Sequence, residues 1–159
     1  MFDEAVTWIA AAGLTGALIW LSVIDIREFR LPNFLTFPLI GAGLIYNFAT
    51  STDFYPYLVG AVAGYAAFWL IENAYKLIRK KDGLGRGDAK LLAAGGAWCA
   101  WTGLPFIVLI GSASALIWLV LTGYAKNPKA DLSHNELRLP FGPFLSFAIA
   151  IVWLSQQIV

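Results

Sequence analysis

The longest apolar run in the chain sets the strongest limit on its fold. It extends from Leu91 to Gly123, as LLAAGGAWCAWTGLPFIVLIGSASALIWLVLTG, without one charged side chain. As a straight helix it would measure about 50 Å at 1.5 Å per residue, whereas the hydrocarbon core of a bilayer is about 30 Å thick. The run therefore predicts two membrane helices. We expect the turn at Thr102 to Pro105, because glycine ends helices and proline begins them.

The composition agrees with a membrane protein. Of the 159 residues, 59% are hydrophobic and only 13% are charged, whereas about 25% of residues are charged in soluble domains. The net charge of +1 gives no sign of a nucleic-acid partner. Membrane lipid is thus the expected surroundings of the chain.

The apolar segments together predict an all-α protein, a six-helix transmembrane bundle that forms a single domain over residues 1–159. The first helix begins with acidic rather than basic residues, so we expect it to be retained and not removed as a signal peptide. The expected spans are approximately 5–24, 34–48, 55–78, 89–103, 106–124 and 139–159.

The basic residues test this division of the chain. With six spans, all eleven lysines and arginines fall at the links after the first, third and fifth helices, and the opposite links contain none. By the positive-inside rule the basic side is cytoplasmic, and both termini lie outside (N-out/C-out).

Two aspartates share the cytoplasmic side of this topology. Asp25 lies at the cytoplasmic end of the first helix and Asp88 at the cytoplasmic start of the fourth. Acidic side chains at membrane depth cost about 2.5 to 3.5 kcal/mol, tend to face a cavity and mark functional sites. The alternative is structural: Asp88 caps its helix, and Asp25 pairs with Arg27 or Arg30.

Paired carboxyl groups could carry out hydrolysis without a cofactor. One takes a proton from water while the other, protonated, donates a hydrogen bond to the scissile carbonyl. The single cysteine, Cys99, excludes a cysteine-rich zinc site, and the single histidine, His134, lies in a polar loop. We therefore expect no bound metal.

The glycines before Asp88 have two possible roles. Gly83, Gly85 and Gly87 alternate along DGLGRGD, where the absence of side chains would let an extended peptide approach the aspartates. The same glycines could simply form a flexible link between two helices.

Two other functions stay open from the residues alone. The first is a metal-dependent membrane lipid phosphotransferase, in which Asp25, Asp88 and Glu72 bind a divalent cation through oxygen ligands. The second is a non-catalytic membrane subunit of a pilus or secretion machine, in which the aspartates only pair with arginines.

Two motifs give the chain a family resemblance. DIREFRLPN, from Asp25 to Asn33, and GRGDAKLL, from Gly85 to Leu92, resemble the type IV prepilin peptidases, the bacterial branch of the GxGD membrane aspartyl proteases. The stretch RLPFGPFLSFA from Arg138 resembles the entry of the family's last helix. The resemblance implies that Asp25 and Asp88 are the catalytic pair.

The resemblance also implies an activity and a location. It implies an aspartic endopeptidase that removes the basic leader of prepilin or pseudopilin precursors at the cytoplasmic face of the bacterial inner membrane. Longer family members have a cytoplasmic region with paired cysteines and methylate the new amino terminus. In this chain the loop from Asp25 to Asn33 is short and Cys99 is the only cysteine, so zinc binding and methyltransferase activity are not inferred. This compact form resembles the short peptidases of Flp/Tad pilus systems. The exact substrate and the oligomeric state stay open.

Four further residues are candidates for substrate binding. Pro32 and Asn33 are expected to start the second helix and to fix the approach of the chain after Asp25. Lys90 follows the family motif but lies about 200° around the helix from Asp88, so it could instead face lipid headgroups. Glu72 could contact the basic leader or Lys90, or form a structural ion pair.

One further pattern concerns packing. Gly60 and Gly64, in GAVAG, have the spacing of a close helix contact in membranes. We expect a packing surface there and not a site.

Overall fold

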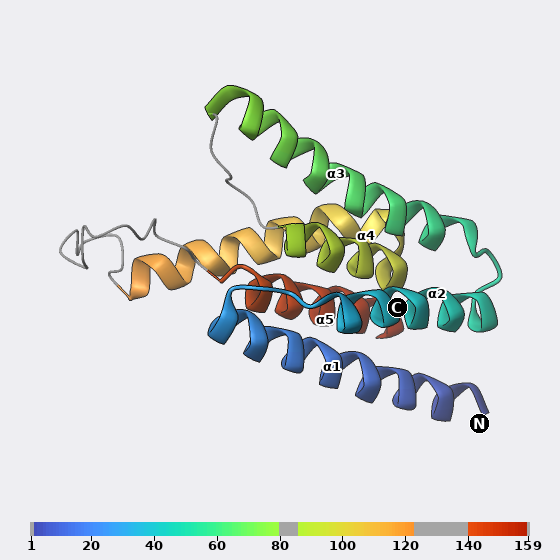
Figure 1. The fold of residues 1–159 in the computed structure, drawn as a ribbon. Coiled ribbons are helices and arrows are strands. Elements are labelled where there is room, and N and C mark those ends of the chain that lie inside the picture. Colours follow the sequence, from blue (N-terminus) through green and yellow to red (C-terminus); the bar gives the residue numbers. More distant parts are fainter. Residues whose placement is uncertain (1, 80–85, 123–139, 159) are drawn as a thin grey trace.

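The computed structural model describes residues 2–79, 86–122 and 140–158, and within these ranges every regular element is a helix (Figure 1). The predicted all-α class is confirmed. The five elements are α1 (Phe2–Glu28), α2 (Asn33–Thr50), α3 (Tyr55–Arg79), α4 (Arg86–Leu121) and α5 (Gly142–Ile158).

The predicted helix starts are close to those observed, but α1 extends further than the approximate first span. Pro32 is the N-cap of α2 in an extended conformation and Asn33 is its first residue, which confirms that these two residues start the second helix. By contrast, α1 continues beyond the predicted end at residue 24 to Glu28. Asp25 is therefore part of the last turn of α1, at the end of the first helix as predicted.

Helix α4 is interrupted at Ala100, where φ is 59° and ψ is 175°. The predicted turn at Thr102 to Pro105 is therefore wrong by a few residues. Gly103 serves packing instead of ending a helix, because a Cβ atom there would lie 2.6 Å from the Cβ atom of Cys99.

The two halves of α4 fold back on each other. A Cβ atom on Gly95 would lie 3.0 Å from Cδ1 of Ile107, although these residues would be about 18 Å apart along a straight helix. Figure 1 shows α4 reversing its direction near the middle. The long apolar run is thus a helical hairpin, as its length requires.

Side-chain amides bind the carbonyl groups next to this break. The Nδ2 atom of Asn47 donates a hydrogen bond to the carbonyl of Ala97 at 3.0 Å. The Nε2 atom of Gln156 donates another to the carbonyl of Cys99 at 2.9 Å. Because a helix break leaves carbonyl groups without intrahelical donors, these two amides stabilise the reversal.

Glycines bring α3 directly against α4. A Cβ atom on Gly60 would lie 2.5 Å from the carbonyl oxygen of Gly96, and one on Gly64 would lie 2.6 Å from that of Leu92. The predicted packing role of Gly60 and Gly64 is confirmed.

The remaining contacts place α5 between α1 and α4 (Figure 1). Helix α2 packs on α4 as well. The core consists mainly of aliphatic side chains from α1, α4 and α5 around Trp98 and Trp153, which are both buried. This arrangement brings the end of α1, the start of α4 and the start of α5 to one end of the bundle.

Two helices of the described ranges are long and apolar enough to cross a membrane, Glu4–Glu28 and Gly87–Leu121, and Gly142–Ile158 is a shorter apolar helix. The six-span count and the N-out/C-out orientation stay predictions.

Candidate active site

Asp25 is buried at the end of α1, where its carboxyl group is held by α5. The residue is only 6% exposed. Its Oδ2 atom accepts a hydrogen bond of 2.9 Å from the backbone N–H of Gly142. Arg27 and Arg30 are exposed, and neither forms an ion pair with Asp25 in the described part of the chain. The alternative that Asp25 pairs with a neighbouring arginine is therefore wrong.

Asp88 approaches Asp25 from a different helix. It occupies the first turn of α4, is partly exposed, and its carboxyl group interacts electrostatically with that of Asp25. Among the described residues, helices α1 and α4 do not pack on each other, and both pack on α5. Two acidic groups from distant parts of the sequence thus lie at one end of the bundle.

The segment after α1 packs against the start of α4. A Cβ atom on Gly87 would lie 2.9 Å from the Cβ atom of Leu31. Gly87 is therefore needed for this contact, and the prediction that it clears a path for substrate finds no support in the contact. Gly85, like Gly83, lies outside the described residues.

Lys90 is turned toward the start of α2. Its Nζ atom donates a hydrogen bond to Oδ1 of Asn33 and lies 5.6 Å from the centroid of the Phe37 ring. The contact found for Lys90 is Asn33 and not Glu72, and the alternative that Lys90 faces lipid headgroups stays a prediction.

Glu72 is buried in α3, with 5% of its surface exposed. A carboxylate at that depth does not offer a surface to a basic leader in this conformation. The described residues contain no group of three or more histidine, cysteine, aspartate or glutamate side chains that could bind a metal ion. Glu72 thus does not join Asp25 and Asp88 in the metal-binding set considered above.

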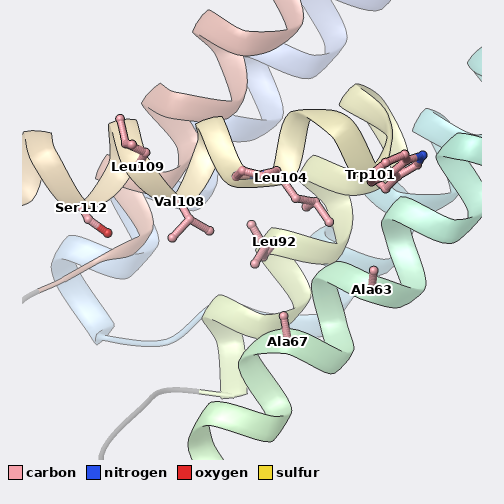
Figure 2. A pocket seen from close by; sticks show the side chains of 9 residues that line it. Ala63, Ala67, Leu92, Trp101, Leu104, Val108, Leu109 and Ser112 are labelled. Carbon is pink, nitrogen blue, oxygen red and sulfur yellow. The ribbon is translucent and has the colours of Figure 1, made fainter.

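A groove of about 610 Å³ lies between α3 and both halves of α4 (Figure 2). Its lining is almost entirely apolar and includes Ala63, Leu92 and Val108, with Ser112 as a polar member. Neither aspartate lines it. Leu92 follows Asp88 by one helical turn, so the groove is adjacent to the aspartates and separate from them.

Sequence reasoning missed the contact of Gly142 with Asp25. The available signal was the FGP stretch, in which a glycine precedes a proline at the start of a helix. First-turn N–H groups have no intrahelical acceptor, so such a glycine presents a free donor. The pattern does not reveal which acceptor it meets.

A helical protein with apolar helices of membrane length and two acidic side chains at one end of its bundle fits the class of membrane proteins in which such side chains mark functional sites. Comparison of the sequence with known protein families identifies the family within this class. Residues 12–120 match the type IV leader peptidase family, and the chain belongs to that family.

Similar proteins include the prepilin leader peptidase/N-methyltransferase of Burkholderia pseudomallei, which is 42% identical over 148 residues, covering 92% of this chain and 46% of the relative. The Aeromonas hydrophila protein of the same name is 38% identical over 151 residues, covering 91% of this chain and 49% of the relative. The Escherichia coli K12 protein of the same name is 39% identical over 155 residues, covering 89% of this chain and 66% of the relative.

The chain spans about half the length of the first two of these relatives. No solved structure matches it. The predicted similarity to the short Flp/Tad peptidases stays a prediction.

Proposed function

We propose that this protein is an aspartic endopeptidase that removes the leader peptide from type IV prepilin or pseudopilin-like precursors, with Asp25 and Asp88 as its catalytic pair. The observation that carries the proposal is the placement of the two carboxyl groups, which α1 and α4 bring to the same end of the bundle. Membership of the leader peptidase family supports the substrate class. The proposal covers the peptidase activity alone, because that is the activity which the matched family describes.

The pair carries out hydrolysis by sharing one proton. One carboxylate takes a proton from a water molecule, and the other carboxyl group donates a hydrogen bond to the scissile carbonyl oxygen. The water oxygen then bonds to the carbonyl carbon. Transfer of a proton to the amide nitrogen allows the C–N bond to break. Because the proton moves between coupled groups, the pair acts as one titrating unit.

The proposed topology has six membrane passes in a single domain, with both termini outside and the aspartates at the cytoplasmic face of the bacterial inner membrane. The reversal of α4 at Ala100 supports the count, because it divides the five elements into six helical segments. In Figure 1, α1 begins and α5 ends at the same end of the bundle, as an even number of passes requires. The exposed Arg27 and Arg30 next to Asp25 support the cytoplasmic side.

The substrate-binding proposal now centres on the residues next to the pair. Lys90 and Asn33 join the start of α4 to the start of α2, and Pro32 and Gly87 fix the intervening segment. These residues hold the surface that a substrate backbone approaches. Gly85 keeps its proposed role as a residue without a side chain before Asp88.

The test is cleavage of a prepilin-like precursor co-expressed with wild-type protein, Asp25→Asn or Asp88→Asn. Both variants keep the size of the side chain and remove its acid–base function, so we expect leader loss only with the wild type. An Asp53→Asn variant, changed in an exposed residue between α2 and α3, is the matched control. Cleavage by either dyad variant at the wild-type rate would falsify the catalytic assignment.

A further inference from the structure

The hydrogen bond between Gly142 and Asp25 joins two residues that are 117 positions apart in the chain. The backbone N–H of Gly142 lies 2.9 Å from Oδ2 of Asp25, and both residues are buried. In this arrangement Oδ2 of Asp25 is occupied by the hydrogen bond from Gly142. Oδ1 is the oxygen left to share a proton with water or with Asp88.

The contact depends on the absence of a side chain at position 142. A Cβ atom there would lie 2.6 Å from Oδ2, 2.9 Å from Cγ and 3.1 Å from Cβ of Asp25. The whole side chain of Asp25 therefore packs on the bare Cα atom of Gly142. Any larger residue must push the carboxyl group away, because rotation of that side chain is the least costly way to relieve the overlap.

The local sequence leaves the N–H of Gly142 free for this purpose. Gly142 begins α5, and N–H groups in a first helical turn lack intrahelical acceptors. The next residue, Pro143, has no N–H. The N–H of Leu145 is already bonded to the carbonyl of Phe141 at 3.1 Å. Gly142 is thus the donor that the start of α5 presents to the end of α1.

We propose that Gly142 is a positioning residue for peptide hydrolysis. Its N–H fixes the orientation of the Asp25 carboxyl group, and its missing side chain provides the space that this orientation needs. The proposal rests on the catalytic role of Asp25 proposed above. It makes the start of α5 a third component of the site, besides α1 and α4.

The first test compares the kinetics of Gly142→Ala and Gly111→Ala on a purified precursor. A Cβ atom on Gly111 would lie no closer than 3.6 Å to its neighbours in α5, so this control adds the same methyl group without overlap. Misplacing a catalytic group by about 1 Å can cost about 100-fold in rate. We expect kcat to fall by about that factor for Gly142→Ala, with KM within about twofold, whereas Gly111→Ala keeps both values.

The second test measures accumulation and thermal unfolding with and without the Asp25 carboxyl group. Asp25→Ala removes Cγ and Oδ2, the two atoms nearest to an added Cβ. We therefore expect any loss of stability caused by Gly142→Ala in the wild-type background to be smaller in the Asp25→Ala background. The two losses of stability can be compared even if too little Gly142→Ala protein accumulates for kinetic measurements.

Two results overturn the proposal: a wild-type kcat for Gly142→Ala, or an equal loss of stability in both backgrounds. Neither result would contradict the assignment of Asp25 and Asp88 as the catalytic pair, because Asp25→Asn tests that assignment separately. If Asp25→Asn is inactive and Gly142→Ala is fully active, only the positioning role fails. If Asp25→Asn is fully active, the proposed function itself fails.

Discussion

The Nζ atom of Lys90 donates a hydrogen bond to Oδ1 of Asn33, and thereby joins the first turn of α4 to the first residue of α2. The ammonium group also lies over the ring of Phe37. Because Asp88 lies in the same turn of α4 as Lys90, this contact links the two sequence motifs at the site. Lys90 therefore restrains the helix start that carries Asp88.

This link predicts a coupled effect of Lys90 and Asn33 on activity. The bond is exposed, so its net contribution is about 1 kcal/mol, which corresponds to about fivefold in rate if it is lost in the transition state. We expect Lys90→Met and Asn33→Ala each to reduce kcat/KM by about that factor. The double variant should be no worse than either single variant.

Initial rates of precursor cleavage by the four proteins measure the coupling. Lys90→Arg is the matched control, because it keeps the charge and a donor. If the reduction in kcat/KM of the double variant equals the product of the two single reductions, Lys90 and Asn33 act independently. That result would contradict the predicted coupling.

The close approach of α3 and α4 predicts a strong effect of one added methyl group. A Cβ atom on Gly96 would overlap the backbone of Gly60, which cannot move without separating the helices. We expect Gly96→Ala to cost about 3 kcal/mol, the upper end of the usual cost of overpacking, and to lower the amount of folded protein in the membrane. Gly41→Ala, where a Cβ atom would meet nothing within 4 Å, should keep or raise the stability.

Thermal unfolding in detergent and the amount of protein in the membrane fraction provide the comparison. A Gly96→Ala variant as stable as Gly41→Ala would mean that α3 and α4 do not pack through these glycines.

The sequence allowed much of this fold to be predicted, because its strongest signals are local. Apolar runs of membrane length and the Pro32 and Asn33 helix start identify α2 and α3 almost to the residue. The break in α4 was misplaced because Gly103 and Pro105 are local signals for a turn, whereas the observed break depends on amide groups of Asn47 and Gln156 from other helices. Such contacts over long distances in the chain leave no pattern near Ala100.

In the candidate site, too, local motifs could be predicted from the sequence, whereas contacts between distant segments could not. The motifs and the predicted topology place Asp25 and Asp88 together, and the structure has both at one end of the bundle. The partners of Lys90 and of Asp25 could not be predicted, because they depend on which helix starts meet. The GxGD glycine Gly87 was given a role toward substrate, but its nearest contact is Leu31, a residue that carries no chemical signal in the sequence.

Chelation separates the peptidase from the metal-dependent alternative. A pair of aspartates that shares a proton hydrolyses peptides without a metal ion, whereas a phosphotransferase of the kind considered above needs a divalent cation. We expect EDTA at millimolar concentration to leave precursor cleavage within about twofold of its untreated rate. Cleavage that is lost with EDTA and restored by Mg²⁺ would contradict the two-aspartate mechanism.

The backbone of Ala100 predicts an unusual sign for a glycine substitution. In the middle of a helix, alanine to glycine costs about 1 kcal/mol. At Ala100 the φ angle of 59° lies in a region where a residue with a Cβ atom is strained by about 1 to 3 kcal/mol. Glycine adopts such angles freely. Ala100→Gly should therefore relieve strain, at the cost of one buried methyl group worth about 0.8 kcal/mol.

The expected net effect of Ala100→Gly is stabilisation of up to about 2 kcal/mol, read as a rise in the midpoint of thermal unfolding in detergent. Ala97→Gly is the matched control: Ala97 is also buried but lies within the regular helix, so it should lose about 1 kcal/mol or more. Opposite signs at two alanines in neighbouring turns would locate the reversal of α4 at Ala100. Equal losses at both positions would mean that the helix continues through Ala100 and that the hairpin turns elsewhere.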